Sequence, residues 1–228
     1  MRYDLHIHSG LSPCADDDMS PNNLIQMALL NKLELISVTD HNSLAQQKVI
    51  HELALKNKLQ YWFGVELNTQ EDVHCLAYFG TLEDMTAFDK ALQPYVDPTP
   101  NDPNIFGHQW IYDNEDTPIE EVTPFLLMGL HLSLDASVNL IHQHHGKAVL
   151  AHLYGRENGI IQQLGFIPES LAIDGVEVTS DEHEARFLSM YPQLSHLPIF
   201  HSSDAHRLDA LVTKAYDLPK LDWFGMKP

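Results

Sequence analysis

The sequence Tyr3-Asp-Leu-His-Ile-His8 is typical of a short β-strand that ends in two histidines. Alternate residues of a strand point to the same side, so we expect His6 and His8 to share one face. Histidine is the commonest metal ligand in proteins, and the chain has 15 histidines among its 228 residues. The positions of the histidines therefore bear on both the fold and the chemistry.

Six further apolar runs have the length and composition of strands. They are Leu35–Thr39, Tyr61–Leu67, Val73–Phe79, Ala148–Leu153, Val176–Thr179 and Ile199–Ser202. Helical patterns lie between several of them and begin at Ser20, Ser43, Thr81 and Ser133. This alternation of strands and helices predicts the α/β class. Only residues 68–72 separate the third strand from the fourth, too few for a crossover helix, so these two strands should be antiparallel.

We expect a single domain over residues 1–228, because that length is ordinary for one α/β barrel. The segment 94–124 differs from the rest, since it holds six prolines and the acidic run Asp113-Asn-Glu-Asp116. We interpret this segment as an inserted excursion or lid that covers or borders the functional site.

The composition is strongly acidic, with 32 Asp and Glu against 13 Lys and Arg and a formal net charge of −19. Such a surface repels polyanions, so we expect no long duplex nucleic acid as a partner. No apolar run approaches the roughly 20 residues of a membrane span, and no signal peptide is apparent, so we expect no membrane partner. The two cysteines, Cys14 and Cys75, are too few for a disulfide framework, which favours a cytoplasmic location.

Side chains that can bind metals stand at the ends of the predicted strands. In parallel α/β barrels the functional groups gather at the carboxyl ends of the strands. His74 begins the fourth strand, but the antiparallel pairing would bring it beside Glu66 at the same rim. The repetition of this placement carries more weight than any single motif. The residues concerned are His6, His8, Asp40, His41, Glu66, His74, His152, Glu177, His201, Asp204 and His206.

Each of these residues also has a simpler interpretation. An isolated His-x-His on a strand is commonly a surface or core feature, and His152 can be a buried histidine bonded to the backbone. Asp40 can be a helix N-cap, and Glu177 can be structural. The remaining histidines and the two cysteines are expected to serve packing or solvation. These histidines are His51, His108, His131, His142, His144, His145, His183 and His196.

Five motifs with potential metal ligands follow one another along the chain. They are His6-Ile-His8-Ser9, Thr39-Asp40-His41, Gly64-Val65-Glu66, Ala151-His152 and Ser203-Asp204-Ala205-His206. Over about residues 3–207 this order resembles the PHP family of metal-dependent phosphoesterases, named after polymerase and histidinol phosphatase. The resemblance implies a distorted seven-stranded TIM-like (β/α)7 barrel of the PHP type. It also implies two or three divalent metal ions. The chain is most similar to small stand-alone members related to nucleoside bisphosphate phosphatases and short-RNA 5′ exonucleases.

The resemblance also implies a ligand set for each metal position. The first set is His6, His8, Glu66 and Asp204; the second is Asp16, His41 and His206; the third is Glu66, His74 and His152. Asp17 and Asp18 remain alternatives to Asp16, because the loop after the first strand is longer than in many members. Mixed imidazole and carboxylate ligands suit zinc, manganese or iron.

The expected activity is hydrolysis of small phosphomonoesters or terminal nucleotide phosphates by a metal-activated hydroxide. Two arginines beside the motifs, Arg156 and Arg207, are predicted to clamp the phosphate, because guanidinium matches phosphate bidentately. His206 or a water molecule would protonate the leaving group. The competing interpretations are another metal-dependent hydrolase of amidohydrolase type and a regulatory domain that binds metal without catalysis.

Overall fold

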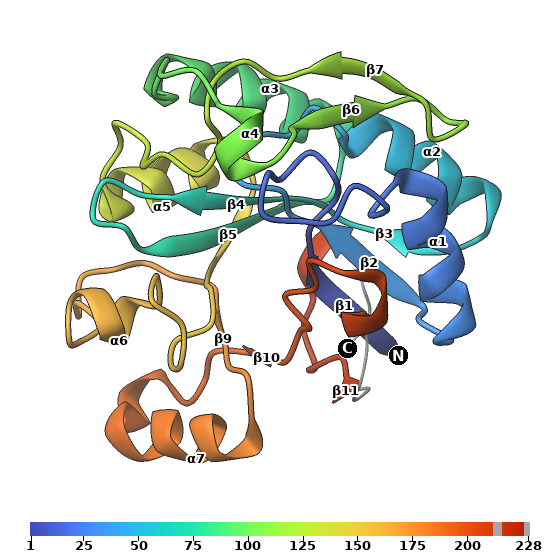
Figure 1. Cartoon of the computed structure of the whole chain (residues 1–228). Coiled ribbons are helices and arrows are strands. Elements are labelled where there is room, and N and C mark those ends of the chain that lie inside the picture. The colour runs from blue at the N-terminus through green and yellow to red at the C-terminus, as the bar shows by residue number, and fades with distance from the viewer. Residues whose placement is uncertain (212–215, 226–228) are drawn as a thin grey trace.

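Two sheets lie at the centre of the computed structural model, which describes residues 1–211 and 216–225 (Figure 1). The strand order is β11-β1-β2-β3 in one sheet and β10-β9-β8-β5-β4 in the other, and β6 and β7 form a separate hairpin. The strands are β1 (Arg2–Ile7), β2 (Leu35–Val38), β3 (Gln60–Tyr61), β4 (Phe63–Asn68), β5 (His74–Phe79), β6 (Trp110–Tyr112), β7 (Pro118–Glu121), β8 (Lys147–Leu150), β9 (Gly175–Glu177), β10 (Ile199–Phe200) and β11 (Tyr216–Asp217).

Helices cover the outer faces of both sheets, so the mixed α/β class is confirmed. The α-helices are α1 (Pro21–Leu30), α2 (Gln47–Lys56), α3 (Leu82–Leu92), α4 (Pro103–Phe106), α5 (Leu134–Gln143), α6 (Ile160–Gln163) and α7 (Asp181–Met190). The 3-10 turns are η1 (Gln93–Tyr95), η2 (Pro192–Leu194), η3 (Leu208–Ala210) and η4 (Trp223–Gly225). Within the described part of the chain, every helix is too short or too polar to cross a bilayer.

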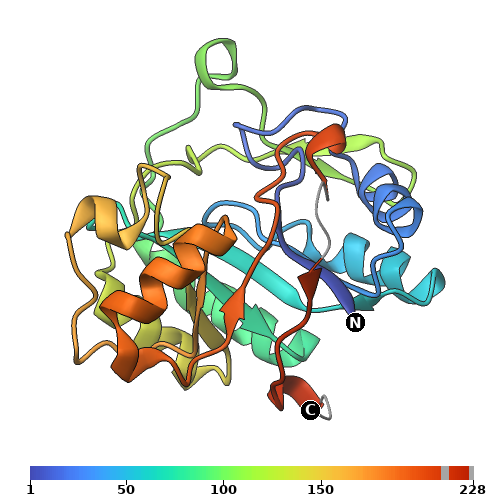
Figure 2. The same ribbon diagram turned by 90° about the horizontal axis from the view of Figure 1, so that it is seen from below.

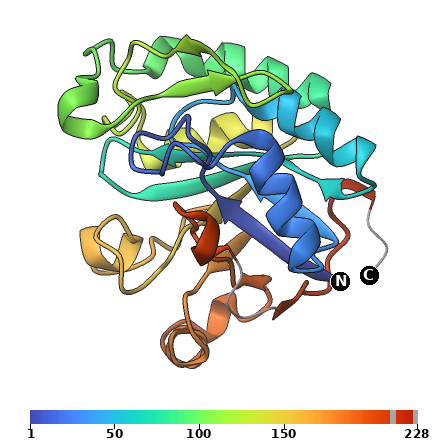
Figure 3. The same cartoon turned by 45° about the vertical axis from the view of Figure 1, so that its right-hand side comes forward.

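Three apolar clusters hold these layers together. Helices α1 and α2 pack on β1 and β2, and Figure 3 shows α1 lying against β1. Helices α3 and α5 pack on β4, β5 and β8, while α7 lies beside β9 and β10 (Figure 2). A third cluster lies between the two sheets and includes Leu5, Leu35, Leu76, Val149 and Phe200.

Each predicted strand appears in the structure, but the run Tyr61–Leu67 is divided in two. β3 pairs with β2 in the first sheet, whereas β4 pairs with β5 in the second. The chain changes partner at Trp62, whose N–H still donates to the carbonyl of Ile36. A continuous apolar run cannot reveal this change, because both halves are equally suited to a buried strand.

The antiparallel pairing of β4 with β5 is confirmed, and it sets Asn68 opposite His74. β5 also runs antiparallel to β8, so it is reversed relative to both neighbours. The start of β5 therefore lies at the rim where β4 and β8 end. This reversal brings His74, at the start of β5, to the rim formed by the carboxyl ends of β4 and β8.

The pairings of the described residues form two sheets and not one closed seven-stranded barrel. Isolated parallel bridges join the rims of the two sheets, between Ile7 and Ala205 and between His41 and Glu66. The closed barrel stays a prediction. The bridges nevertheless hold the strand ends of both sheets at one common rim.

A register shift in β1 decides where its side chains point. Asp4 of β1 pairs with Ile36 of β2, and Ile7 pairs with Val38. Between these two pairs β1 therefore advances three residues while β2 advances two, which is the pattern of a β-bulge. Leu5 packs between the sheets, whereas Ile7 packs under α1 and α2. The extra residue lets β1 bury Leu5 centrally and still turn His6 toward the rim.

The segment 94–124 contains α4 and the β6–β7 hairpin, and it contacts the loop of residues 9–19 that follows β1. The N–H of Trp110 donates to the carbonyl of Gly10 at 3.0 Å, and the hydroxyl of Tyr112 donates to the carbonyl of Asp17 at 2.9 Å. A β-carbon at Gly10 would lie 2.7 Å from the hydroxyl of Tyr112, so only glycine allows this close packing. The segment therefore braces the loop that follows the two strand histidines.

Candidate metal centre

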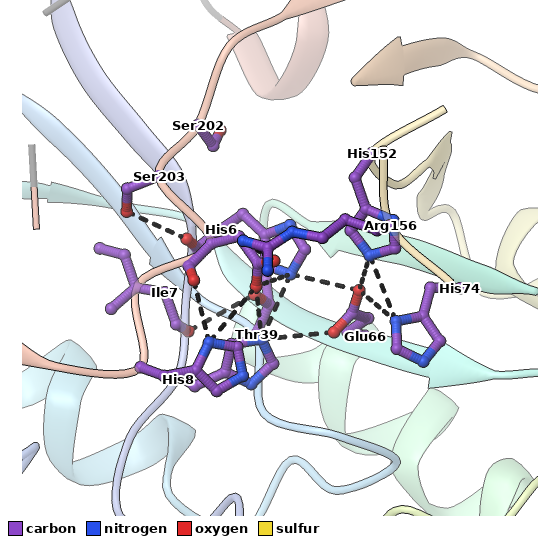
Figure 4. Close-up of polar contacts among 12 residues, drawn as sticks. His6, Ile7, His8, Thr39, Glu66, His74, His152, Arg156, Ser202 and Ser203 are labelled. Carbon is purple, nitrogen blue, oxygen red and sulfur yellow. Dashed lines mark hydrogen bonds and ion pairs between the residues drawn. The ribbon is translucent and has the colours of Figure 1, made fainter. Parts of the chain in front are cut away.

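Glu66 lies at the middle of a cluster of histidines (Figure 4). It projects from β4, and its side chain is buried. Imidazole nitrogens from β1, from the start of β5 and from the segments that follow β2 and β8 all approach its carboxylate within 3.3 Å. These nitrogens belong to His6, His8, His41, His74 and His152.

The first group of ligand atoms comes from β1 and the segment after β10. The Nε2 atoms of His6 and His8 lie 3.3 Å apart and each lies 3.4 Å from Asp204 Oδ1. Both histidines are fully buried, as expected for residues two apart on an inner face. The first predicted ligand set is thus brought together around one point.

Two hydrogen-bond chains orient these histidines. Glu177 Oε1 lies 3.0 Å from His6 Nδ1, so this nitrogen donates and Nε2 keeps its lone pair for a metal. Ser12 Oγ donates to Asp40 Oδ1 at 2.7 Å and lies 3.0 Å from His8 Nδ1, which gives His8 the same tautomer. The structural role of Glu177 is therefore to set the tautomer of His6.

The roles of Ser9, Ser12 and Asp40 were missed by sequence reasoning. Asp40 is no helix cap, since α2 begins only at Gln47, and its oxygens accept from the Ser9 N–H and hydroxyl at 2.7 Å. The acid directly before His41 was the available signal in the sequence, but its partners come from a loop whose path the sequence does not reveal.

The other two groups share residues with the first. His8, His41 and His206 offer nitrogens within 4.8 Å of one another, and His8 and His206 stack at 4.1 Å. His41, Glu66 and His74 form another such group, and His152 joins it at 3.1 Å from Glu66. All predicted ligands except Asp16 therefore meet in one continuous cluster.

Two of the predicted ligands have strained backbone in the segments that follow strands. His152 lies two residues after β8 with φ 27°, and Asp204 lies four residues after β10 with φ 52°. A residue other than glycine in this region costs about 1–3 kcal/mol, a cost that is found mostly at functional sites. In this conformation His152 Nε2 lies 3.1 Å from Glu66 Oε1, and Asp204 Oδ2 lies 3.1 Å from Arg156 Nη2.

The donor set fits divalent metal ions on two grounds. His41 Nδ1 is buried and lies 3.3 Å from Glu66 Oε2, but the geometry between these two atoms does not allow a hydrogen bond. The lone pair or proton on Nδ1 therefore has no partner, which is unusual for a buried polar atom. One carboxylate also faces five imidazoles, an arrangement that cations between them would satisfy. The identity and number of the ions stay predictions, with zinc, manganese or iron preferred by the ligand types.

The electrostatics divide the histidines of the metal-free protein into two kinds. Burial lowers the pKa of His6 and His8, but the facing carboxylates outweigh it, so the pKa of His6 is well above its usual value and that of His8 is about 9. Burial and the charge on His8 lower the pKa of His41 well below its usual range and that of His206 to about 4. Burial raises the pKa of Glu66, but the surrounding histidines outweigh this and hold it well below the usual range.

Metal binding should therefore release protons and depend on pH. The pKa of His8 in the folded, metal-free protein is about 9, against an ordinary value of 6.5. Protonated His8 therefore adds its full contribution to the free energy of unfolding below pH 6.5, and this contribution is lost as the pH rises through 9. Metal needs the neutral ring, so we expect affinity to rise over the same interval. Calorimetry in buffers of different ionisation enthalpy measures both the proton release and the affinity. A metal affinity that is flat from pH 6.5 to 9 would contradict this expectation.

Removing the charge that orients His6 should weaken metal binding without removing a ligand. We expect Glu177→Gln to lower metal affinity by about ten- to a hundredfold, because the amide is a weaker acceptor for His6 Nδ1. Competition with a chelator gives the measurement. The exposed Glu182 on α7 offers a matched control, Glu182→Gln, which should bind metal as the unmodified protein does. Equal affinities in the two variants would argue against the orienting role.

A cavity of about 280 Å³ opens onto the cluster. Arg156 lines it, and its Nη2 lies 3.1 Å from Asp204 Oδ2. Arg207 does not line it; its Nε lies 3.3 Å from Asp209 and 3.8 Å from Asp16, and its side chain is 65% exposed. The structure thus brings only one of the two predicted clamps to the site.

Asp16 likewise lies outside the cluster, with a side chain that is 59% exposed. Its N–H donates to the carbonyl of His206 at 2.9 Å, so its backbone is close although its carboxylate points away. Asp17 and Asp18 are also exposed. No residue of 94–124, a segment described in full, lines the cavity, so the lid role and the second-metal ligand both stay predictions.

Several histidines outside the cluster have carboxylate partners elsewhere. His108 pairs with Glu121, His131 with Asp97 and His142 with Asp174. Cys14 and Cys75 are free thiols.

Comparison with protein families gives one assignment. A model of the PHP domain matches residues 4–164. The matched segment contains His6, His8, His41, Glu66, His74 and His152 and stops before Asp204 and His206. No curated protein sequence matches the chain significantly.

Solved structures share the fold at low sequence identity. Endonuclease Q from Pyrococcus furiosus matches with 19% identity and a TM-score of 0.67, over 92% of this chain and 49% of that one. A putative metal-dependent phosphoesterase from Bifidobacterium adolescentis matches with 16% identity and a TM-score of 0.59, over 90% and 87%. An amidohydrolase from Chromobacterium violaceum, with bound sulfate and no metal, matches with 19% identity and a TM-score of 0.64, over 96% and 92%.

The exclusion of long duplex nucleic acid was wrong. A complex of endonuclease Q, with 18% identity and a TM-score of 0.63, holds a 27-mer duplex with an abasic lesion at its active site. Net charge sums over the whole surface, whereas a duplex meets only one face of a protein, so an acidic total does not exclude a duplex as partner. The chain spans about half the length of endonuclease Q, with 49% of that chain covered.

Proposed function

The chain belongs to the PHP domain family, and on that premise we propose that it is a metal-dependent phosphoesterase acting on small phosphomonoesters or terminal nucleotide phosphates. One observation carries the proposal. The guanidinium of Arg156 lies beside Asp204 in the cavity that is also lined by Glu66, His74 and His206. A phosphate in this cavity would meet cations from the metal side and from Arg156 together.

The ligand groups would hold two or three divalent ions. His6, His8, Glu66 and Asp204 would hold one, His41 and His206 a second, and Glu66, His74 and His152 a third. Such ions, when bound, neutralise phosphate oxygens and make water nucleophilic near neutral pH.

The residues of the chain supply binding and orientation. Arg156, whose side chain is 52% exposed, can leave Asp204 for a phosphate and hold it by two parallel hydrogen bonds. Once the ring of His6 is neutral, Glu177 favours the tautomer in which Nδ1 carries the proton and Nε2 is free to bind a metal. The pKa of about 4 keeps His206 neutral near pH 7, which favours a ligand role over proton donation to the leaving oxygen.

Phosphate release from p-nitrophenyl phosphate and from nucleotides, by protein loaded with Mn²⁺, Zn²⁺ or Fe²⁺, tests the proposal. The comparison substrates are an amide and a duplex with an abasic site, which correspond to the printed descriptions of two structurally similar proteins. Turnover of the phosphomonoesters that disappears with chelator and returns with metal supports the proposal. Turnover of the amide alone would assign an amidohydrolase activity, and metal binding without turnover of any substrate would assign a regulatory domain.

A further inference from the structure

A second cavity adjoins the metal centre. Its volume is about 380 Å³, which lies within the roughly 300–1,000 Å³ of ligand pockets. Arg156 lines both cavities, and the neighbours Ser203 and Asp204 line one each. Figure 4 shows Ser202 and Ser203 on one side of the Arg156 side chain and His74 on the other. A molecule whose phosphate is held by Arg156 can therefore extend into this second space.

The charges in the lining favour a neutral occupant. Asp4 lines the cavity, its side chain is buried, and its Oδ2 atom has no hydrogen-bond partner. A second phosphate would lie near this carboxylate, and a cationic group would lie near Arg156. Both would be repelled, since a charge of the same sign a few ångströms away is unfavourable in a partly buried site.

The hydrogen-bonding groups in the lining suit hydroxyls. The Tyr3 hydroxyl accepts from the N–H of His201 at 2.8 Å, and Ser202 Oγ accepts from the N–H of Leu5 at 3.3 Å. Each of these hydroxyls keeps its own hydrogen to donate, whereas the Oδ2 atom of Asp4 is itself buried and contributes only its charge. A sugar hydroxyl can accept from both donors.

We propose that this cavity is a subsite for the uncharged, hydroxyl-rich part of a sugar phosphate. The sugar lies beyond Arg156 among Tyr3, Ser202 and Thr179, while its phosphate lies at the metal centre. The proposal rests on the proposed phosphoesterase function and narrows its substrates to sugar phosphomonoesters. It adds a recognition site that the metal ligands alone do not provide.

The test compares kcat/KM for ribose 5-phosphate with kcat/KM for p-nitrophenyl phosphate, which carries no hydroxyl-bearing sugar. Ser202→Ala should lower the ratio of kcat/KM for ribose 5-phosphate to kcat/KM for p-nitrophenyl phosphate about three- to tenfold, which is the effect of losing one hydrogen bond to a neutral group. Ala210→Leu, which adds bulk to the lining of the cavity, should lower this ratio further. The exposed Ser195 gives a matched control, because Ser195→Ala should leave the ratio unchanged. An unchanged ratio in both cavity variants, with each variant folded by circular dichroism, would overturn the subsite.

A second phosphate tests the charge argument. Ribose 1,5-bisphosphate should have a lower kcat/KM than ribose 5-phosphate, and a higher value would assign the cavity to an anion.

Binding of free ribose, followed by ligand-observed NMR, tests the cavity without turnover. If ribose binds, Ala210→Leu removes that binding and the protein hydrolyses no phosphomonoester, the subsite is supported and the phosphoesterase function is overturned. If the protein hydrolyses p-nitrophenyl phosphate but does not bind ribose, the phosphoesterase function is supported and the subsite is overturned.

Discussion

Glu66→Gln should abolish the metal centre as a unit. We expect metal content to fall by more than half and kcat/KM to fall at least about a thousandfold, which corresponds to roughly 4 kcal/mol of lost transition-state stabilisation. The reason is the position of the carboxylate, which lies within 3.3 Å of nitrogens from five histidines and is the acidic member of two ligand groups. Metal analysis by mass spectrometry and phosphate release give the two measurements.

The exposed Glu83 on α3 provides the control for this substitution. Glu83→Gln removes the same charge from the protein, and we expect it to retain full metal content and activity. Circular dichroism of Glu66→Gln separates loss of metal from loss of the fold. Normal metal stoichiometry in a folded Glu66→Gln protein would show that the carboxylate does not bridge the groups.

Arg156→Ala should separate phosphate binding from metal binding. We expect kcat/KM on a phosphomonoester to fall about ten- to a hundredfold, or roughly 1.5–3 kcal/mol, with metal content unchanged. Among the described residues, Arg156 forms its ion pair with Asp204, which also faces His6 and His8, so we expect the cluster to keep its arrangement without Arg156. Steady-state kinetics on metal-loaded protein measure the effect, and a parallel loss of metal would contradict a role confined to phosphate.

Arg207→Ala is the matched comparison, because it removes an arginine that the sequence motifs had also marked as a clamp. Its ion pairs with Asp16 and Asp209 are exposed, and such pairs contribute only about 0–1 kcal/mol. We expect less than about a threefold change in kcat/KM. A larger loss would show that the loop carrying Asp16 rearranges to bring Arg207 to the substrate.

Three of the solved structures that share this fold are named for different activities, so the fold alone does not identify the reaction. Residues of the site must make that choice. Arg156 distinguishes the phosphoesterase proposal, because a guanidinium beside the ligand cluster recognises an anionic group and has no evident use with a neutral amide.

Local pattern was enough to predict the strands, the α/β class and most of the side chains that the structure gathers around Glu66. Apolar runs that end in His, Asp or Glu can be found in the sequence without any knowledge of pairing, and parallel strands bring their carboxyl ends to one rim. The short link between β4 and β5 even placed His74 correctly, because five residues cannot form a crossover and the strand must reverse.

The tertiary structure alone decided the orientation of loops and the partners of buried polar groups. The positions of Asp16 and Arg207 depend on the path of the loop 9–19, which the distant β6–β7 hairpin braces through Tyr112. The pairing of Ser12 with Asp40 joins residues 28 apart in sequence, and that of His6 with Glu177 joins residues 171 apart. Sequence determines which side chains can bind a metal, since that is a property of residue type and strand period. Which of them meet, and in which tautomer, depends on long-range packing that no local period records.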